Sequence, residues 1–482
     1  MTPPDPRRWR MLPVVLSATF MALFDFNVVN VAAPSLSTGL HASDAALELI
    51  VGGYAFSYAS GLVTGGRLGD LFGYRRLFLI GMTGFTIASV LCGLAQSPGQ
   101  LVAARLLQGF TAAAMVPQVL ALITSVFPAK ERPRAVSWFG VAIGGGAVAG
   151  QVLGGLLLDA DLFGLGWRVI FLINLPVGLV ALPLAARLLP GHRAEARPRL
   201  DPLGALGLAA TVALALVPLV LGRTLHWPAW GWISLAAALP ALAAVLWWQL
   251  RLTRRGGHPL LDLSLFRNRY FNAGLVINMT FMAFFTSIML GITLFLQGGL
   301  HLSPLDSGLT FGPLGLVFAV TSIAAQRFTA RFGYKVITAG CVVAIAGLLV
   351  MLAELQISGT HITALELQPA MILIGIGNGL SFPALIGAVL AGVQGHQAGG
   401  AAGVLTTVQQ FSSAAGVAVL GTLFFSTLGS RPSIADFVSA LELVTGLGGV
   451  LILTATGLTV LLRPRTATES VRNSVELADA VA

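Results

Sequence analysis

The sequence consists almost entirely of long apolar runs that carry no charge or very few charges. Fourteen runs, bounded by charges, Gly or Pro, are long enough to cross a bilayer, which takes about 20 mostly apolar residues. They lie near residues 11–34, 45–67, 77–96, 99–126, 134–158, 168–189, 203–222, 229–250, 271–297, 307–325, 336–354, 368–392, 401–427 and 437–462. Backbone exposed to lipid must satisfy its own hydrogen bonds, and barrel-type alternation is absent, so the runs are expected to be helices. The predicted fold class is an all-α polytopic membrane protein with 14 transmembrane helices.

Charged residues make up 10% of the 482 residues, whereas a soluble domain usually has about 25%. This low fraction excludes a soluble enzyme, a disordered regulator and a nucleic-acid binder. Neither lysine, Lys130 or Lys335, follows a glycine, so the sequence has no phosphate loop of the Gly-Lys-Ser/Thr type. No His/Cys metal cluster is present either. We therefore expect no cofactor, no metal and no enzymatic activity. Transport would have to be driven by a gradient.

The positions of the basic residues predict the orientation in the membrane. All but four of the 28 Lys and Arg residues lie in the N-terminus, the even-numbered loops or the C-terminal tail, and the four exceptions are Arg105, Arg168, Arg223 and Arg431. Cytoplasmic loops attract the basic excess. The net charge of +9 is thus an orientation signal, and we expect a multi-pass plasma-membrane protein with both termini in the cytoplasm.

A short internal repeat predicts the domain organisation. Arg67-Leu-Gly-Asp-Leu-Phe-Gly-Tyr-Arg75 matches Arg327-Phe-Thr-Ala-Arg-Phe-Gly-Tyr-Lys335 at an offset of 260 residues, a shift of eight spans. Repeated halves are a common plan among transporters. We expect an N-terminal six-helix bundle in 1–190, two inserted helices with their loops in 191–260, a C-terminal six-helix bundle in 261–465 and a cytoplasmic tail in 466–482.

Two charged residues inside predicted spans are the first candidates for chemistry. Asp25 is the only acid well inside a span, and Arg105 lies at a similar depth in the fourth span. Charges in the bilayer are costly, so they pair, face a wet cavity or mark a functional site. If both face one cavity, the protonation of Asp25 can depend on exposure and on a bound substrate. A purely structural acid, or a permanent buried ion pair, is the alternative.

The loop between spans 2 and 3 is a candidate gating element. Gly66 and Gly73 allow close approach and a tight turn. Asp70 can cap a helix N-terminus or pair with a basic group, and Arg75 and Arg76 can anchor the loop to the lipid surface. A simple positive-inside anchor is the alternative interpretation.

The fifth span carries a face of small residues. Gly146, Gly150 and Gly154 are spaced four apart, the pattern that lets two membrane helices pack closely, and Gln151 and Gly155 lie beside them. The pattern predicts close packing and leaves open whether the face also seals a moving interface.

Polar and aromatic side chains in other spans are candidates for lining a substrate cavity. They are Asn30, Asn278, Phe281, Phe285 and Gln409. Aromatic and polar groups together would suit an adaptable pocket, and packing against lipid or other helices is the alternative for each.

Several motifs together resemble the major facilitator superfamily, and within it the fourteen-span drug:proton antiporter family. The similar segments are Asp25 to Pro34, Gly66 to Arg76, Arg105 to Gly109, Gly140 to Gly155, Trp167 to Pro176 and His258 to Arg269. They follow one another over nearly the whole chain.

The resemblance implies two six-helix bundles that rock about a central cavity. It implies that Asp25 couples transport to protons and that Arg105 tunes the protonation of Asp25. It also implies that the loop with Asp70 helps to hold the outward-facing state. The glycine face of the fifth span would form part of the interface between the bundles. The sequence departs from the family pattern at Leu71 and Tyr74, where basic residues are usual, and at Gln151, where proline is usual.

From these observations we expect a proton-coupled exporter of amphipathic or apolar small molecules, such as drugs and antibiotics. Its partners would be the substrate, protons and the lipid bilayer, without nucleic acid, and the protein would be a monomer. A dedicated exporter of an endogenous secondary metabolite, siderophore or lipid is the alternative within the same fold. A membrane scaffold or sensor that transports nothing is the alternative from another class.

Overall fold

The regular structure of the described chain is helical, and it contains no β-strand. The computed structural model describes residues 7–128, 130–191, 201–222, 225, 227–257, 259–391, 393, 397–428 and 432–462. The predicted tail 466–482 lies outside these residues. The N-terminal helices are α1 (Arg8–Leu40), α2 (Asp44–Phe72), α3 (Tyr74–Gly93), α4 (Pro98–Val126), α5 (Arg132–Asp159), α6 (Val169–Leu172) and α7 (Asn174–Leu188). The others are α8 (Pro202–Leu221), α9 (Ala229–Arg254), α10 (Arg269–Leu294), α11 (Pro304–Phe332), α12 (Lys335–Ser358), α13 (Gln368–Val389), α14 (Ala398–Ser426) and α15 (Ile434–Leu458).

Thirteen helical segments of the described chain are long and apolar enough to cross a membrane. One of them, Gly166–Leu188, combines a short 3-10 turn with α6 and α7. The remaining predicted run, 45–67, forms the 29-residue helix α2, which is not among the thirteen. The side chains at positions 44, 45 and 48 near its start lie outside those that the structure describes, and the thirteen segments are drawn from the described residues alone.

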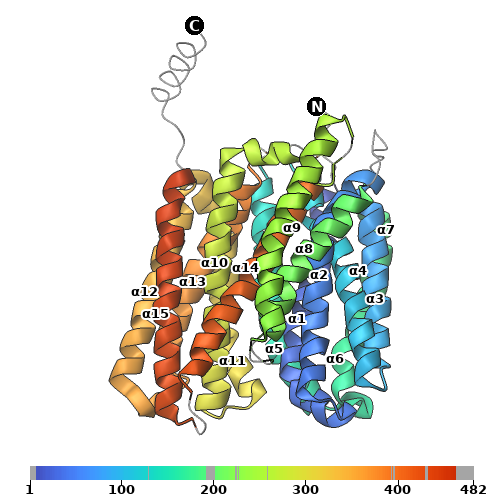
Figure 1. The fold of residues 1–482 in the computed structure, drawn as a ribbon. Helices are drawn as coiled ribbons and strands as arrows, with labels where there is room; N and C mark the ends of the chain where they lie inside the picture. Colours follow the sequence, from blue (N-terminus) through green and yellow to red (C-terminus); the bar gives the residue numbers. More distant parts are fainter. Residues whose placement is uncertain are drawn as a thin grey trace.

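The helices form two groups that lie side by side (Figure 1). We call α1–α7 the N-terminal group and α10–α15 the C-terminal group. Each group is held by its own helix pairs, such as α2 with α4 and α12 with α13, while α2 with α14 and α5 with α11 join the two groups. The helices α8 and α9 pack on each other, and α8 also contacts α2 and α14, so this pair lies over the seam between the groups (Figure 1).

Both copies of the sequence repeat place a glycine with positive φ between two helices. In the first, α2 ends at Phe72, Gly73 has φ +91°, and α3 follows. In the second, α11 ends at Phe332 and Gly333 has φ +59° before α12. Positive φ is accessible to glycine without the steric cost of a Cβ, which explains why this residue recurs at both positions.

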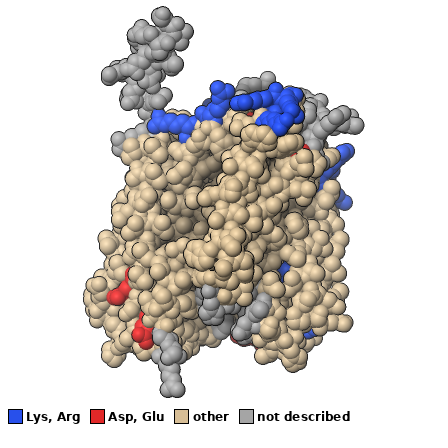
Figure 2. Space-filling view, viewed as in Figure 1, with Lys and Arg blue, Asp and Glu red and all other residues tan. Residues whose placement is uncertain are grey.

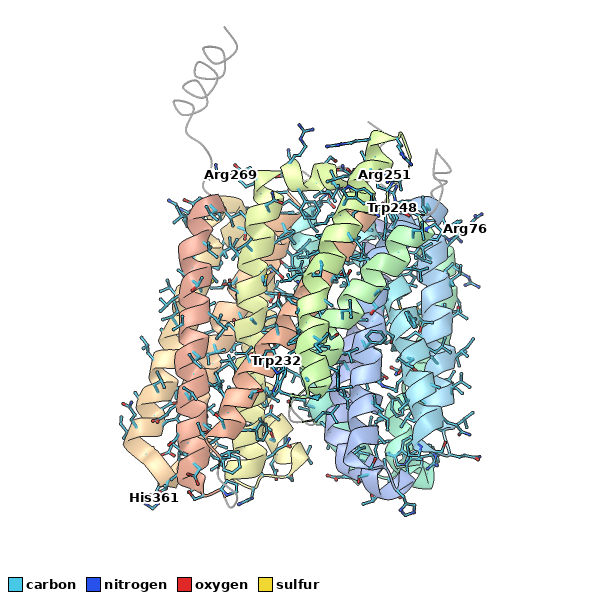
Figure 3. The ribbon with its side chains drawn as sticks, viewed as in Figure 1. Arg76, Trp232, Trp248, Arg251, Arg269 and His361 are labelled. Atoms are coloured by element: carbon cyan, nitrogen blue, oxygen red, sulfur yellow. The ribbon has the colours of Figure 1, made fainter. Side chains whose placement is uncertain are left out.

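Basic side chains gather at one end of the molecule. Arg76, Arg251 and Arg269 lie at this end, whereas His361 lies at the opposite end (Figure 3). The space-filling view shows the Lys and Arg residues of this face concentrated along the same edge (Figure 2). We call it the basic end.

A buried carboxylate ties the inserted helices to the segment that leads into α10. Asp201 Oδ1 accepts hydrogen bonds from Gly204 N (2.9 Å) and Trp248 Nε1 (3.1 Å), and Oδ2 accepts one from Gln249 Nε2 (2.7 Å). Gln249 Oε1 in turn accepts from Leu261 N at 3.1 Å. Through Asp201 and Gln249, the α8–α9 pair is therefore fixed to the connection that precedes the C-terminal group.

Candidate functional site

Asp25 and Arg105 meet in the interior of the N-terminal group. Asp25 lies on α1 and Arg105 on α4, and both side chains are 0% exposed. Arg105 Nη1 donates to Asp25 Oδ2, and Arg105 Nε donates to the carbonyl oxygen of Ile50 on α2 at 3.1 Å. The pair thus connects three helices of the group, at a depth where both charges are removed from water.

Amide and hydroxyl groups complete the surroundings of the carboxylate. Gln108 Nε2 donates to Asp25 Oδ1 (2.8 Å), and Gln108 Oε1 accepts from Arg105 Nη1 (2.7 Å). Asn174, the first residue of α7, donates through Nδ2 to Asp25 Oδ1 at 3.2 Å. Ser89 Oγ on α3 accepts from Gln108 (2.8 Å) and from Asn174 (3.3 Å). We call Asp25, Ser89, Arg105, Gln108 and Asn174 the carboxylate cluster.

Two aromatic rings cover the guanidinium. Arg105 Cζ lies 4.4 Å from the centroid of the Tyr54 ring and 5.8 Å from that of Phe171, within the range of cation–π attraction. Arg105 Nη2 is buried and has no hydrogen-bond partner in the described part of the chain. The cation therefore depends on Asp25 for its charge balance. Protonation of Asp25 would leave a buried unpaired cation, which is energetically costly.

The sequence indicated part of this cluster. Asp25 and Arg105 stood out as charges inside spans, and the structure brings them into contact. Gln108 follows Arg105 by three residues, so the helical period alone places both on one face of α4. Ser89 and Asn174 come from α3 and α7 and reach Asp25 only through tertiary packing, for which no sequence pattern was available.

Asp70 connects the two helix groups at the basic end. Its Oδ1 accepts from Gly399 N at 3.0 Å and its Oδ2 from Gly400 N at 3.1 Å, at the N-terminus of α14. Tyr74 Oη also donates to Oδ1 at 2.7 Å, and Arg67 Nη1 lies 3.7 Å from Oδ2. The first N–H groups of a helix lack intrahelical partners and carry partial positive charge, so the carboxylate supplies both acceptors and a complementary charge.

The other residues of this loop have distinct surroundings. A Cβ at Gly66 would collide with the carbonyl oxygen of Gly399, so glycine permits the close approach of α2 and α14. Gly73 provides the turn at positive φ. Arg75 Nη2 donates to the carbonyl oxygen of Ala186 near the end of α7, and Arg76 is exposed at the basic end (Figure 3).

The glycine face of α5 packs against α1, not against the C-terminal group. A Cβ at Gly146 would lie 2.8 Å from the carbonyl oxygen of Phe20, and one at Gly150 would lie 2.7 Å from that of Phe24. A Cβ at Gly154 would lie 2.7 Å from the side-chain Cγ2 of Val28. This corrects the expectation that the face forms part of the interface between bundles, because its contacts are within the N-terminal group.

The neighbouring face of α5 makes the contact with the C-terminal group. A Cβ at Gly155 would lie 3.1 Å from Leu305 Cα on α11, and one at Gly308 would lie 3.3 Å from the carbonyl oxygen of Gln151. A period of four residues indicates that a helix approaches closely, but it does not identify that helix.

The residues predicted to line a cavity are only partly grouped. Phe281 and Phe285 on α10 stack with centroids 6.5 Å apart, and Phe281 also stacks on Phe382 of α13 at 6.3 Å. Asn278 is buried three residues before Phe281, and neither of its amide atoms has a partner in the described chain. Gln409 lies on the adjacent helix α14, with Nε2 unpaired within the described residues. The side chain of Asn30 lies outside what the structure describes.

Two pockets lie elsewhere, in the N-terminal group. One, of about 470 Å³, is lined by residues of the α1 and α5 ends and the 3-10 turns, including Ser35, Gly39 and Trp167. The other, of about 420 Å³, lies between α1, α5 and the α6–α7 junction and includes Asn174 of the carboxylate cluster.

Comparisons with known proteins identify the family. Residues 15–417 match the family profile of the Major Facilitator Superfamily. The chain is 43% identical to the probable actinorhodin transporter of Streptomyces coelicolor, over 89% of this chain and 74% of that protein. It is 37% identical to the puromycin resistance protein pur8 of Streptomyces alboniger, over 90% of this chain and 84% of that protein. It is 34% identical to the tetracenomycin C resistance and export protein of Streptomyces glaucescens, over 88% of this chain and 77% of that protein.

A solved structure has the same fold. The human organic anion transporter MFSD10 superposes with a TM-score of 0.67, covering 94% of this chain and 100% of that chain at 17% sequence identity. The proton:xylose symporter XylE superposes with a TM-score of 0.60, covering 93% of this chain and 95% of that chain. With the helix arrangement and the family match in agreement, the chain belongs to the major facilitator superfamily.

Proposed function

We propose that the protein is a secondary active exporter that exchanges protons for amphipathic or apolar small molecules, such as antibiotics. The carboxylate cluster carries the proposal, because Asp25 and Arg105 are fully buried in the interior of the N-terminal group and intramembrane charges are functional by default. The names of the relatives, which include transport, resistance and export proteins, support a small-molecule substrate.

The proposed topology has fourteen spans and places the basic end in the cytoplasm. It counts α2 with the thirteen apolar segments, as its contacts with α4 and α14 suggest. Residues 1–190 and 261–465 would be the two six-helix bundles, 191–260 the insertion and 466–482 a cytoplasmic tail. The concentration of Arg and Lys at one end (Figure 2) and the positive-inside rule support this orientation.

In the proposed cycle, the charge state of Asp25 selects the conformation. The structure has the basic end held together by the Asp70 contact with α14, so this state would open to the outside. A proton that reaches Asp25 would remove the charge opposite Arg105 and destabilise the buried pair. Rearrangement toward the inward-open state would follow, and cytoplasmic substrate would compete with the proton. Coupling requires that both ligands distinguish the two states.

Replacement of Asp25 tests the proposal. In proteoliposomes with an acidic lumen and puromycin added outside as the probe, we expect Asp25→Asn to abolish accumulation driven by the pH gradient. Downhill exchange, measured in vesicles loaded with puromycin and without a pH gradient, should persist. Asp159→Asn, which changes an exposed acid at the end of α5, is the matched control and should pump normally. Proton-driven accumulation that persists in Asp25→Asn would refute the coupling role of this residue.

A second candidate is export of one endogenous secondary metabolite, with drug resistance as a side effect. The relatives named for actinorhodin transport and tetracenomycin C export favour it. A panel of structurally unrelated compounds, each measured with and without a proton gradient, separates the two. Transport of one chemical class only would select the dedicated exporter.

A further inference from the structure

A pocket on the side of the N-terminal group lies between α1, α5 and α7. It is lined by Phe20, Met21 and Phe24 of α1, by Leu153, Leu156, Leu157 and Ala160 at and just beyond the end of α5, and by Ile173, Asn174 and Val177 at the start of α7. Leu153, Leu156 and Val177 are 44%, 46% and 37% exposed, so they form the mouth on the outside of the helix group. We call this the α1–α5–α7 pocket.

The lining contains one polar side chain, that of Asn174. Its amide nitrogen donates to Asp25 Oδ1 and to Ser89 Oγ. No described residue donates a hydrogen bond to its amide oxygen, although the side chain is only 2% exposed. This oxygen is not among the fully buried unpaired atoms of the described chain, so Asn174 offers an accessible acceptor at the pocket that is directly linked to the carboxylate cluster.

We propose that the α1–α5–α7 pocket binds an uncharged, largely apolar molecule that carries one hydrogen-bond donor, with that donor on the Asn174 oxygen. The volume of about 420 Å³ lies within the roughly 300–1,000 Å³ of small-molecule sites. No charged side chain lines the pocket, so an ionic ligand would lose its hydration without compensation. Access from the bilayer suits a molecule that partitions into lipid.

The position of Asn174 gives the ligand a route to Asp25, and this second part rests on the proposed proton coupling. While Asp25 is ionised, Asn174 turns its N–H groups toward the carboxylate. A proton on Asp25 Oδ1 would place two donors against each other, and a half-turn of the amide would relieve this. The turn would present N–H groups to the pocket, where a ligand hydroxyl could no longer donate to Asn174. A donor-bearing ligand and a proton on Asp25 therefore oppose each other through one amide.

Photolabelling of the full-length protein in phosphatidylethanolamine and phosphatidylglycerol vesicles tests the site. The probes are decanol with a diazirine in its chain and the methyl ether of the same compound, which lacks the donor. We expect the alcohol to label peptides that contain 20–24 and 153–160, with the ether about two- to tenfold weaker, the range given by one hydrogen bond. Labelling spread evenly over the lipid-facing helices, or equal labelling by both probes, would overturn the proposal.

Three variants separate the pocket from nonspecific effects. Leu157→Trp should fill the pocket and abolish the labelling, and Val177→Trp serves the same purpose if the first variant does not fold. Leu184→Trp, on α7 at a side chain that is exposed and outside the lining, should label as wild type. Asn174→Leu should keep the labelling but lose the preference for the alcohol. Retained preference in Asn174→Leu would rule out its oxygen as the acceptor.

This experiment uses no proton gradient, so its outcome is independent of the proposed function. If Asp25→Asn still pumps but the alcohol labels the pocket as expected, the proton coupling fails and the binding site stands. If Asp25→Asn uncouples transport but the alcohol shows no preference, the binding site fails alone.

Discussion

At the scale of single residues, the carboxylate cluster shows what the sequence could and could not indicate. A charge inside an apolar run is expensive enough that a partner was predictable, and Arg105 was the only buried candidate of opposite sign in its predicted span. The amides that complete the cluster were not predictable in the same way. Asn and Gln occur in many membrane helices, and only packing determines that Gln108 and Asn174, and not Asn278, reach a carboxylate.

Replacement of Gln108 by Leu tests the importance of this neutral partner. The change keeps a similar side-chain size but removes a donor to Asp25 and the acceptor of Arg105 Nη1. Because the remaining polar groups stay buried, we expect a loss of about 1–3 kcal/mol of stability together with slower proton-driven transport. Thermal unfolding in detergent and transport in vesicles measure the two effects. The exposed Gln356→Leu on α12 is the control and should unfold as wild type does.

At the scale of elements, composition indicated the helices well, and their partners less well. The predicted runs correspond to long helices because the bilayer requires about 20 apolar residues and an internally bonded backbone. The face of α5 that carries Gly146, Gly150 and Gly154 was expected at the bundle interface and instead packs on α1. Small residues at a period of four report a close approach, and the identity of the approaching helix depends on the order of all the helices in space.

A pair of glycine substitutions on α5 tests this packing. A Cβ at Gly150 would lie 2.7 Å from the Phe24 carbonyl oxygen, whereas one at Gly145 would meet only a ring carbon of Phe20 at 3.9 Å. We expect Gly150→Ala to lower stability by about 1–3 kcal/mol through overpacking. Gly145→Ala should be neutral or raise stability by up to about 1 kcal/mol, because alanine is a better helix former. Equal unfolding temperatures for the two variants would contradict the assigned contact with α1.

The start of α1 is tied to the loop between α4 and α5, and this tie should depend on pH. Arg8 Nε and Nη2 donate to Glu131 at 2.8 and 2.9 Å, and Trp9 Nε1 adds a third bond at 3.1 Å. The hydrogen bond from Arg8 holds the pKa of Glu131 below its ordinary value. A lowered folded pKa means that the stabilisation is present above the ordinary pKa and is lost as the pH falls through the lowered value.

Hydrogen exchange of residues 8–11 measures the tie. After correction for the intrinsic pH dependence of exchange, we expect protection at neutral pH and its loss under acid conditions below the ordinary pKa of glutamate. Glu131→Gln should exchange faster than wild type already at neutral pH. If exchange in this variant matches that of wild type at every pH, the tie has no role in holding α1.

At the scale of the whole molecule, two groups of helices meet along α2–α14 and α5–α11, with the inserted pair over one seam. The repeat around Gly73 and Gly333 predicted two related groups with two additional helices between them, because the same sequence motif recurs eight spans later. It gave no indication of where the inserted pair would lie. That position depends on the surfaces of α2 and α14 and on the bonds of Asp201, which join residues distant in sequence.

Closure of the basic end should depend on the charge of Asp70. Asp70→Asn removes the negative charge at the N-terminus of α14, where charge-assisted hydrogen bonds contribute about 1.5–3 kcal/mol. We therefore expect the open form of this end to gain population by about tenfold or more. Spin labels at the exposed positions of Arg76 and Arg269 report the separation by pulsed electron resonance, and the distances should lengthen and broaden. Distances unchanged from wild type, with Asp159→Asn as the control, would remove Asp70 from the closing contact.

The composition of α2 also bears on how the chain is made. The membrane-insertion machinery evaluates each segment largely by its hydrophobicity as it leaves the ribosome, and the apolar residues of α2 are interrupted by glycines and by polar side chains such as Ser57 and Ser60. Its extensive packing is with α4, which is synthesised later. The glycines that fit α2 closely against α4 and α14 add little hydrophobicity of their own, so packing that forms only after the later helices are made contributes to holding α2 in the bilayer.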